Sequence, residues 1–397
     1  MSAAIPPALP PLHGLKVLEL GQLIAGPFAG KTLGDFGAEV IKIEPPDGGD
    51  PLRQWRLLHD GTSLWWQVQS RNKKSVVLDL RSDAGRADVR RLAAEADVLI
   101  ENFKPGTLEK WGLGYEVLSA ANPGLILLRV SGYGQDGPYR DRPGFAVVAE
   151  AVGGLRHLMG EPGRVPVRAG VSLGDTLAAL HGVIGVLLAL QARARCVGPD
   201  APKGRGQVVD VALYEAVFNC MESLLPEYSA FGVVRQPAGS ALPGIAPSNA
   251  YRCADGQVVI GGNGDSIYQR LMAAIGREDL GRDPDLAGNA GRAAQADRLD
   301  AAITAWTVQR PVAEVVATLQ AVQVPVGRIY TVQDIAEDPH YRARGMIQRI
   351  VTAAGLALDV PGVVPRLCAT PGSLRTLAPD LGQHTREVLG PGAVEDR

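Results

Sequence analysis

The stretch LKVLELGQLIAGPFAGKTLGDFGAEVIKI, residues 15–43, joins two short apolar runs through a segment typical of a helix. Residues 15–20 and 39–43 have the length of buried strands, and Gly37 marks a turn before the second run. Pro27 lies where a helix would begin, because proline is tolerated in the first helical turn. The stretch therefore predicts a strand–helix–strand unit.

The same alternation continues along the chain. Apolar runs at residues 75–80, 97–100 and 125–130 predict further strands, and residues 84–94 predict a helix. Strands that alternate with helices are typical of a parallel sheet with helices on both faces. We therefore expect an α/β fold with a doubly wound, Rossmann-like parallel sheet in the larger domain.

The composition changes near residue 229, where Gly- and Pro-rich sequence begins. A two-strand signal follows at residues 251–260, the Ala- and Arg-rich region 280–302 predicts an exposed amphipathic helix, and residues 347–351 resemble a strand. These changes predict a smaller α+β domain and a tail that returns to the first domain. The expected parts are 1–228 (large domain), 229–335 (small domain) and 336–397 (returning segment).

Charge and cysteine usage narrow the class of protein. Forty basic residues stand against forty-two acidic ones, so no overall field draws the protein to nucleic acid or to an anionic membrane. The segment MSAAIPPALPPLHG, residues 1–14, lacks the pattern of a signal peptide, so we expect a cytoplasmic protein. The four cysteines show neither metal-ligand spacing nor a redox pair, and we expect reduced thiols at Cys196, Cys220, Cys253 and Cys368.

One glycine pattern is a false lead. Gly132, Gly134 and Gly137 match the spacing of a dinucleotide-binding fingerprint and follow a predicted strand. However, Pro138 and Pro143 follow where a helix should begin, so no helix N-terminus can face a pyrophosphate. We therefore expect no nicotinamide or flavin cofactor.

A single carboxylate, Asp175, lies before an uncharged stretch at residues 176–190. At the start of a buried helix it would face free N–H groups and the positive dipole end, which keep it ionised and able to act as a nucleophile. Aspartate is also a preferred helix N-cap, so a purely structural role stays open at this point. The stretch 176–190 is too short to cross a bilayer and predicts a core helix.

Seven segments in this order resemble the family III coenzyme A transferases, the group that includes formyl-CoA:oxalate transferase and the carnitine- and bile-acid-linked enzymes. The resemblance covers nearly the whole chain. The segments are LIAGPFAGKTLGDFGAEVIKIEPPDGGDPLR, RNKKSVVLDL, DVLIENFKPGTLEKWGLGY, SGYGQDGPYRDRPGF, GVSLGDTLAALHG, KGRGQVVDVAL and LGQHTREVL. The resemblance implies that Asp175 is the nucleophile and carries CoA as an aspartyl thioester, without metal or redox cofactor.

The resemblance also implies a CoA site in the first domain. It assigns Leu23, Ile24 and Ala25 to the pantetheine, and Leu78, Arg81, Asn102 and Phe103 to the adenine side, with Lys110 at a phosphate. Basic residues near predicted strand ends, Lys73, Lys74 and Lys104, are further candidates for phosphate contacts. Pro45 and Pro46 replace arginines of the formyl-CoA enzyme and Trp111 replaces a methionine, so Arg53 is an expected substitute.

Two alternatives to CoA transfer remain. Within the same fold, 2-methylacyl-CoA racemases use a histidine where this chain has Phe145, which cannot transfer a proton, and Ala146 replaces the acidic residue common after it. His157 and His181 remain as possible bases. The other alternative is a non-catalytic CoA-binding protein, although a binder has no need for Asp175.

The segments most resemble dicarboxylate-using members, such as succinyl-CoA:glutarate transferases. We hypothesise succinyl-CoA as donor and a C4–C6 dicarboxylate as acceptor. Phe145 and Arg168 are expected at the acceptor, because an arginine fork binds a carboxylate bidentately, and Arg142 and Arg252 are other candidates. Gly261 and Gly262 are a candidate lid or an ordinary turn. The resemblance also implies an interlocked homodimer.

Overall fold

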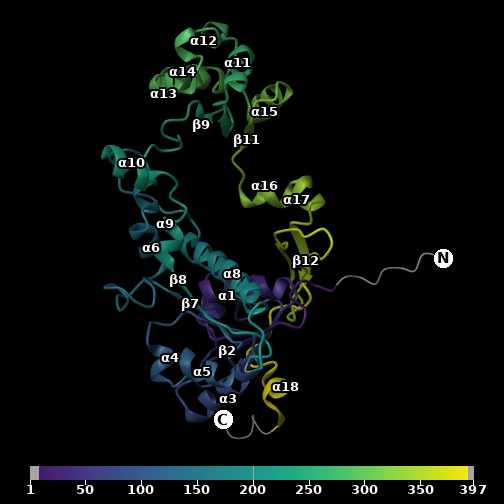
Figure 1. Ribbon diagram of the computed structural model, residues 1–397. Coiled ribbons are helices and arrows are strands. Elements are labelled where there is room, and N and C mark those ends of the chain that lie inside the picture. The colour runs from purple at the N-terminus through teal and green to yellow at the C-terminus, as the bar shows by residue number, and fades with distance from the viewer. Residues whose placement is uncertain (1–8, 200, 392–397) are drawn as a thin grey trace, which may run out of the picture. The chain divides into compact units, whose positions relative to one another are not determined.

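The computed structural model describes residues 9–199 and 201–391, which form two compact units (Figure 1). The first unit comprises the described chain up to Leu155, then Ala169–Glu222, and the described chain from His340 onward. The second unit comprises Arg156–Arg168 and Ser223–Pro339. Each unit has its own buried apolar core.

These limits differ from the boundaries expected at 228/229 and 335/336. The change from the first unit to the second falls at 222/223, and the return falls at 339/340. Residues 156–168 also join the second unit, although they interrupt the first. Residues 1–8, part of the segment in which we saw no signal peptide, lie outside the described residues.

A six-stranded sheet forms the centre of the first unit, and every neighbouring pair of its strands is parallel. Its strands are β1 (Lys16–Glu19), β2 (Glu39–Glu44), β5 (Lys73–Val77), β6 (Val98–Glu101), β7 (Ile126–Ser131) and β8 (Val208–Ala212). The predicted α/β fold with a parallel sheet is confirmed. Apolar runs of the sequence predicted every strand of this sheet except β8.

The spatial order of the strands is β5-β2-β1-β6-β7-β8, so the direction of winding reverses between β1 and β6. The chain segments that leave these two strands therefore diverge at the carboxyl edge of the sheet. In open α/β sheets a crevice forms at this place, and ligands bind there.

Helices cover both faces of the sheet. One face carries α1 (Ala25–Asp35), α6 (Ala146–Val152), α8 (Leu173–Arg193) and α9 (Leu213–Phe218), and the other carries α3 (Asp83–Glu95), α4 (Thr107–Lys110) and α5 (Tyr115–Ala121). Successive strand residues point to opposite faces, so Val17 and Leu128 enter the first core while Leu18 and Leu127 enter the second.

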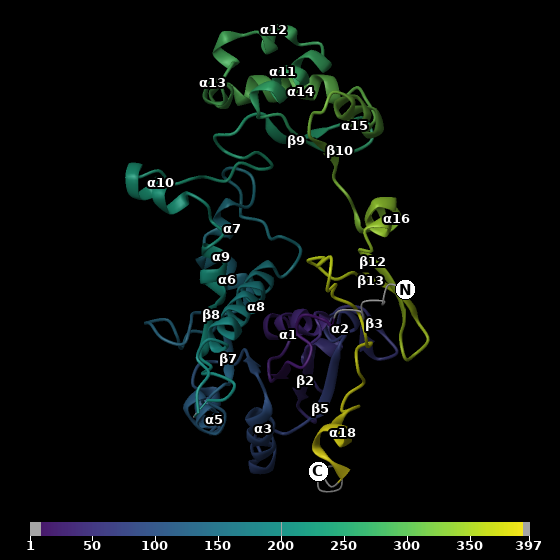
Figure 2. The same cartoon turned by 45° about the vertical axis from the view of Figure 1, so that its right-hand side comes forward.

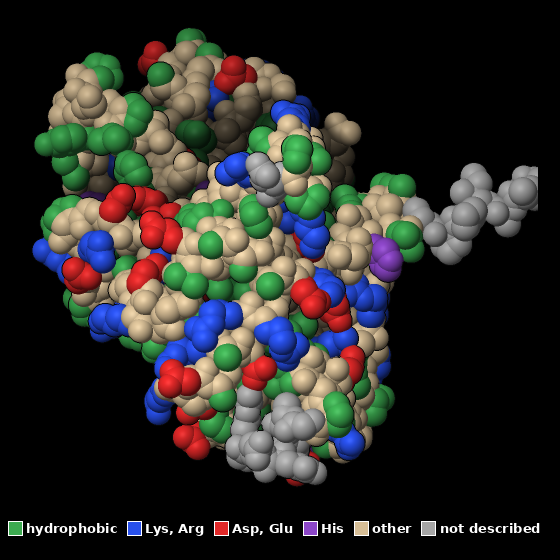
Figure 3. All heavy atoms as spheres, turned by 60° about the horizontal axis from the view of Figure 1, so that its bottom comes forward, with side chains coloured by type: hydrophobic (Ala, Val, Ile, Leu, Met, Phe, Trp, Pro, Cys, Tyr) green, Lys and Arg blue, Asp and Glu red, His purple; other side chains and the backbone are tan. Residues whose placement is uncertain are grey.

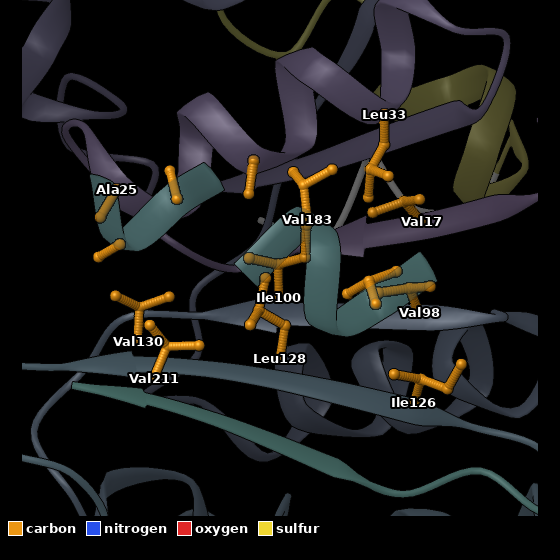
Figure 4. Packing of buried hydrophobic residues seen from close by; sticks show 14 of the residues in the cluster. Val17, Ala25, Leu33, Val98, Ile100, Ile126, Leu128, Val130, Val183 and Val211 are labelled. Carbon is orange, nitrogen blue, oxygen red and sulfur yellow. The ribbon is translucent and has the colours of Figure 1, made fainter. Parts of the chain in front are cut away.

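The long helix α8 lies close against β7 and β8. A Cβ atom at Gly182 would lie 3.0 Å from Leu128 Cδ2, and one at Gly185 would lie 2.5 Å from Val209 Cγ1. Val183 packs over Ile100 and Leu128 (Figure 4). Among the described helices α8 is long and apolar enough to cross a membrane, but its packing on the sheet is that of a core helix.

The outer edge of β5 is covered by the returning tail of the chain. His384 N–H donates to Ser75 O at 2.9 Å, Ser75 N–H donates to His384 Nδ1 at 3.2 Å, and Val77 N–H donates to Thr385 Oγ1 at 3.0 Å. Figure 2 shows α18 (Thr385–Leu389) beside β5. The tail thus hides an edge that would otherwise be open to another strand.

Shorter elements complete the first unit. They are the 3₁₀ helix Pro51–Gln54, β3 (Leu58–His59), β4 (Thr62–Ser63), α2 (Leu64–Gln69), β12 (Ile347–Val351) and β13 (Ala357–Pro361). Two short helices, α7 (Leu155–Leu158) and α17 (Pro339–Ala343), lie where the chain passes between the units.

The second unit packs helices on a small antiparallel sheet of β9 (Ser248–Arg252), β10 (Gln257–Gly261) and β11 (Val326–Arg328). Its helices are α10 (Leu224–Phe231), α11 (Asp265–Ala274), α12 (Glu278–Gly281), α13 (Asn289–Ala294), α14 (Ala296–Thr307), α15 (Val312–Ala321) and α16 (Val332–Glu337). Much of 280–302 is helical, as expected, but the helix is not continuous and not wholly exposed. A 3₁₀ turn at Pro284–Leu286 and the N-cap Gly288 divide the region, and Leu280 and Leu299 are buried.

The surface mixes charges of both signs. On the face shown in Figure 3, Lys and Arg side chains are interspersed with Asp and Glu side chains. This distribution agrees with the near balance of basic and acidic residues in the sequence.

Candidate functional site

A pocket of about 280 Å³ opens in the first unit beyond the carboxyl ends of β1, β6 and β7. It therefore lies at the point where the winding of the sheet reverses. Its lining is Gln22, Leu23, Ile24, Ala25, Trp55, Asn102, Phe103, Lys104, Pro105, Val130, Ser131, Gly132, Arg140, Arg142, Pro143, Gly144, Phe145, Asp175 and Leu213.

The loop after β1 is fastened to the end of β6 by Asn102. Gln22 N–H donates to Asn102 Oδ1 at 2.8 Å, and Asn102 Nδ2 donates to Gln22 O at 2.8 Å. A Cβ atom at Gly21 would lie 3.0 Å from Asn102 Oδ1, so a side chain there would press against this amide. The paired hydrogen bonds hold one wall of the pocket in place.

The next residue of this loop, Leu23, has a left-handed backbone with φ of 65°. Such a conformation is unfavourable for a residue with a branched side chain and persists where the surroundings enforce it. Asp50 does so, because both of its carboxylate oxygens accept the Leu23 N–H at 3.1 Å. The side chain of Leu23 is thereby turned to line the pocket.

Beneath this loop lies a buried network of charges. Lys42 Nζ contacts Asp50 Oδ2 at 2.8 Å and Glu19 Oε1 at 3.0 Å, and it donates to Gly21 O at 2.8 Å. Burial alone would lower the pKa of Lys42, but the charges of Asp50, Glu19 and Glu44 raise it overall. Lys42 is therefore a fixed cation that joins the carboxylates under the loop to its backbone.

Asp175 lies in the first turn of α8, as the third residue of the helix, and is partly buried. The N-cap is Ser172. The N-cap reading of Asp175 is therefore wrong, while its predicted place near the positive end of a helix dipole is confirmed. The carboxylate lines the pocket from there.

The start of α8 touches the start of α6, whose N-cap is Phe145. A Cβ atom at Gly174 would lie 3.1 Å from Ala146 O, so a glycine is needed at this approach. Gly174 N–H also points to the buried Glu150 Oε1 at 3.4 Å. These contacts place Phe145 and Asp175, from two segments, on the same pocket.

Most of the predicted site residues come together here. Asp175, Phe145 and the CoA candidates Leu23, Ile24, Ala25, Asn102, Phe103 and Lys104 all line the pocket. Phe103 also contacts Trp111 edge to face, with ring centroids 5.3 Å apart. Arg81 and Lys110 are exposed outside the lining, and their roles at CoA stay predictions.

Other residues predicted for the CoA site lie outside the lining of this pocket, and their roles at CoA stay predictions. Arg53 is buried and donates to Glu44 through Nε at 2.8 Å and Nη2 at 2.9 Å, so its fork is already occupied by a carboxylate. Leu78 belongs to the core of the sheet. Lys73 and Lys74 begin β5 and so lie at its amino end, where they bind Glu19 and Glu39 respectively.

The second unit contains five of the candidate site residues from the sequence: Arg168, Gly261, Gly262 and the further candidates His157 and Arg252. Arg168 is exposed and lies at the end of residues 156–168. Gly261 ends β10, and Gly262 lies in the turn between β10 and α11, where its N–H donates to Pro247 O at 2.8 Å. This geometry is that of a strand-to-helix turn, and a lid role stays a prediction.

The lining includes residues that we had not assigned from the sequence, among them Trp55 and Arg140. Arg140 follows β7, which the sequence did predict as a strand, and so does Arg142, which was already a candidate at the acceptor. Their position after a strand that ends at the reversal point was the available signal. The Pro-rich sequence around them gave no element to which they could be assigned.

The site can be compared with known proteins. The model of the family described as CoA-transferase family III matches residues 12–385. Succinyl-CoA--D-citramalate CoA-transferase of Chloroflexus aurantiacus is 48% identical over 391 residues, which cover 98% of this chain and 95% of that protein. The alpha subunit of succinyl-CoA--L-malate CoA-transferase of the same species is 43% identical over 385 residues. These residues cover 96% of this chain and 88% of that protein.

A solved structure shows the same architecture. The crystal structure of a CAIB/BAIF family protein from Brucella suis superposes with a TM-score of 0.83 at 36% sequence identity. The match covers 96% of this chain and 99% of that one.

Proposed function

Because the chain belongs to CoA-transferase family III and is a CoA-transferase, we propose that it moves CoA from succinyl-CoA to a C4–C6 dicarboxylate. The observation that carries this proposal is Asp175, which faces the pocket from the first turn of α8 beside the loop Leu23–Ala25. The names of the two Chloroflexus aurantiacus relatives support the donor and the class of acceptor.

The proposed chemistry uses Asp175 as a covalent carrier. A carboxylate oxygen of Asp175 attacks the thioester carbon of succinyl-CoA, the C–S bond breaks, and CoA leaves as a thiolate. The product is a mixed anhydride between Asp175 and succinate. The thiolate then attacks the Asp175 carbonyl carbon, which releases succinate and leaves an aspartyl-CoA thioester.

The acceptor reverses these steps. Its carboxylate attacks the aspartyl thioester and expels the thiolate, which then attacks the acceptor carbonyl of the new anhydride. Acyl-CoA forms and the Asp175 carboxylate is restored. In each step an acyl carbon gains one of oxygen or sulfur and loses the other, so the reaction balances without redox change. We propose that no cofactor besides the CoA substrate takes part.

The CoA portion is proposed to lie along the loop after β1 and the end of β6. Leu23, Ile24 and Ala25 offer an apolar wall for the pantetheine, while Phe103 and Lys104 offer an aromatic face and a cation. Lys104 is exposed, as a contact to a mobile phosphate requires. Hydrogen bonds from Leu23 N–H to the buried Asp50 fasten this wall.

The racemase alternative needs a histidine, and none is among the described residues that line this pocket. Phe145 lines the pocket where a proton-transferring side chain would be needed. His181 lies on α8, where Nδ1 contacts Leu177 O at 2.8 Å and Nε2 contacts Asn219 Nδ2 at 3.1 Å. Its ring nitrogens are thus engaged by α8 and by the residue that follows α9.

A homodimer is part of the proposal. On the outer face of α8, Ile184 is 54% exposed and Leu188 is 65% exposed, and Leu180 and Leu187 extend this apolar surface. Contiguous exposed apolar side chains on a core helix favour a protein interface. We propose that a second copy covers this face and that the dimer works in the cytoplasm.

The test is mass spectrometry of acyl-CoA species after the protein is mixed with succinyl-CoA and a pool of mono- and dicarboxylic acids. A new dicarboxyl-CoA is the expected product and names the acceptor. If no acyl group moves while a 2-methylacyl-CoA exchanges its α-hydrogen with D₂O, the racemase alternative is correct. If neither reaction occurs, the proposed donor is wrong.

A further inference from the structure

We infer that Arg142 binds the distal carboxylate of the dicarboxylate, the one that does not react with Asp175. This inference deepens the proposed function and rests on it. It replaces Arg168 as the acceptor cation, because Arg142 lines the pocket together with Asp175 and Phe145.

The loop that carries Arg142 is closed at its base by two glycines. A Cβ atom at Gly132 would lie 3.0 Å from Gly144 Cα, and one at Gly144 would lie 2.9 Å from Gly132 Cα. The backbone thus leaves β7, makes a loop, and returns to Gly132 just before Phe145 begins α6. Arg142 is therefore held near the starts of α6 and α8, where Asp175 lies.

The guanidinium of Arg142 is positioned by an aromatic ring. Its Cζ lies 3.5 Å from the ring centroid of Tyr139, and its backbone N–H donates to Tyr139 O at 2.9 Å. Tyr139 in turn contacts Tyr133, with centroids 5.9 Å apart. Stacking on the face of a ring leaves the edge of the guanidinium plane, with its N–H donors, directed to the side.

No carboxylate of residues 9–199 or 201–391 pairs with Arg142. Other arginines are already engaged: Arg129, on β7, binds Glu101 at 2.7 Å and Glu109 at 2.6 Å. Arg140 has an exposed contact of 3.5 Å to Asp141. A pre-positioned guanidinium fork without a carboxylate partner among the described residues, on the pocket that Asp175 also lines, is suited to bind a second carboxylate bidentately.

Lys104 suits this role less well. It follows Asn102 and Phe103 at the end of β6, on the side proposed for CoA, and an ammonium binds as a point charge without the planar match of a fork. Since donor and acceptor react in turn at Asp175, one distal-carboxylate site serves both succinyl-CoA and the acceptor acid. Arg142 therefore selects dicarboxylates in both half-reactions.

The experiment compares wild type, Arg142→Gln and Arg142→Lys with two matched substrate pairs. The dicarboxylate pair is succinyl-CoA with glutarate, and the monocarboxylate pair is butyryl-CoA with valerate. For Arg142→Gln we expect kcat/KM for succinyl-CoA and for glutarate to fall on the order of 100-fold, as for loss of a bidentate charged contact. The rate with butyryl-CoA and valerate should stay within threefold, and Arg142→Lys should lie between.

Arg90→Gln is the matched control, because Arg90 is an exposed arginine on α3, on the other face of the sheet. It should match wild type with both substrate pairs. Equal losses of Arg142→Gln on both pairs would overturn the inference, since they indicate a contact to CoA or a general effect on the loop. Unchanged kinetics would overturn it as well.

The variant Arg168→Ala distinguishes Arg142 from Arg168 as the residue that binds the distal carboxylate. A dicarboxylate-selective loss in Arg168→Ala with none in Arg142→Gln would overturn the inference and restore the sequence-based assignment. Failure of the proposed function is a different result: wild type itself would then form no glutaryl-CoA from succinyl-CoA. Circular dichroism of each variant excludes misfolding as the cause of a loss.

Discussion

Both carboxylate oxygens of Asp50 accept the backbone N–H of Leu23, each at 3.1 Å. Asp50 also binds the buried Lys42 at 2.8 Å, so one carboxylate connects the charge network to the left-handed residue of the pocket wall. The conformation of the loop that we propose to bind CoA thus depends on a residue that is itself buried.

For Asp50→Asn we expect the free energy of unfolding to fall by about 3 kcal/mol, because the change leaves Lys42 short of a buried counter-charge. We also expect a higher KM for succinyl-CoA. Urea unfolding and initial rates measure the two effects. Asp47→Asn, on the exposed part of the same loop, should change stability by less than about 0.5 kcal/mol. Equal stability of the two variants would contradict this role.

Asp175→Asn should abolish turnover without unfolding the protein. The amide cannot form the anhydride, whereas the loss of one charge near the helix N-terminus costs only about 0.3–1 kcal/mol. The measurement is the rate of acyl-CoA formation, with deamidation excluded by mass. Activity above about one hundredth of wild type would count against nucleophilic catalysis.

Gly30→Ala should destabilise the first unit by about 3 kcal/mol. A Cβ atom at Gly30 would lie 1.8 Å from Glu19 Oε2, so Glu19 would have to move away from Lys42 and Lys73. Gly327→Ala, where nothing lies within 4 Å of the new Cβ atom, is the control and should change stability by less than about 0.5 kcal/mol. If Gly30→Ala melts like wild type, the close approach is wrong.

The contact between tail and β5 should weaken in acid. Burial lowers the pKa of His384, and the Lys74 charge lowers it too, against the nearby Glu387, which raises it. Since the folded pKa is below the unfolded value of about 6.5, the unfolded state binds the proton first. The stability from neutral His384 is therefore present above about pH 6.5 and is lost as the pH falls below it.

Hydrogen exchange at Ser75, whose N–H donates to His384 Nδ1, measures this loss. Exchange should accelerate between pH 7 and pH 5 relative to its intrinsic rate, and His384→Gln should remove that dependence. His13→Gln, at an exposed histidine, should retain it. The same pH dependence in wild type and His384→Gln would show that another group is responsible.

The apolar face of α8 predicts the oligomeric state. Ile184→Glu combined with Leu188→Glu should convert a dimer to a monomer, because the interface would have to bury two carboxylates without partners. Light scattering coupled to gel filtration measures the mass. Val332→Glu, at an apolar residue that is 83% exposed in the second unit, should leave the mass unchanged. A monomeric wild type would refute the dimer.

The parts of the fold that could be predicted from the sequence are those with a local pattern of residues. Strands β1 and β7 are short apolar runs, and their periodicity is visible along the chain. Strand β8 was missed because Asp210 interrupts its apolar pattern at the edge of the sheet. The breaks in the helix expected over 280–302 were not foreseen, because the high alanine content of the region was given more weight than its proline and glycine residues.

The site was predicted less evenly. Asp175 and Phe145, which the resemblance matched within motifs, line the same pocket, and their roles there stay predictions. The ion pair of Arg53 with Glu44 was not foreseen, because Glu44 ends another element and an ion pair of this kind has no signature along the chain. The close contact of Gly132 with Gly144, which places Arg142, likewise exists only in three dimensions.

The contact of the C-terminal tail with the edge of β5 also has a consequence for synthesis of the chain on the ribosome. The strand ends at Val77, yet the residues that bond its edge, from His384 to Thr385, are synthesised about three hundred positions later. A nascent chain therefore carries a bare strand edge throughout most of its translation. Until the tail has been made, this edge lacks its cover and is open to pairing with a strand of another chain.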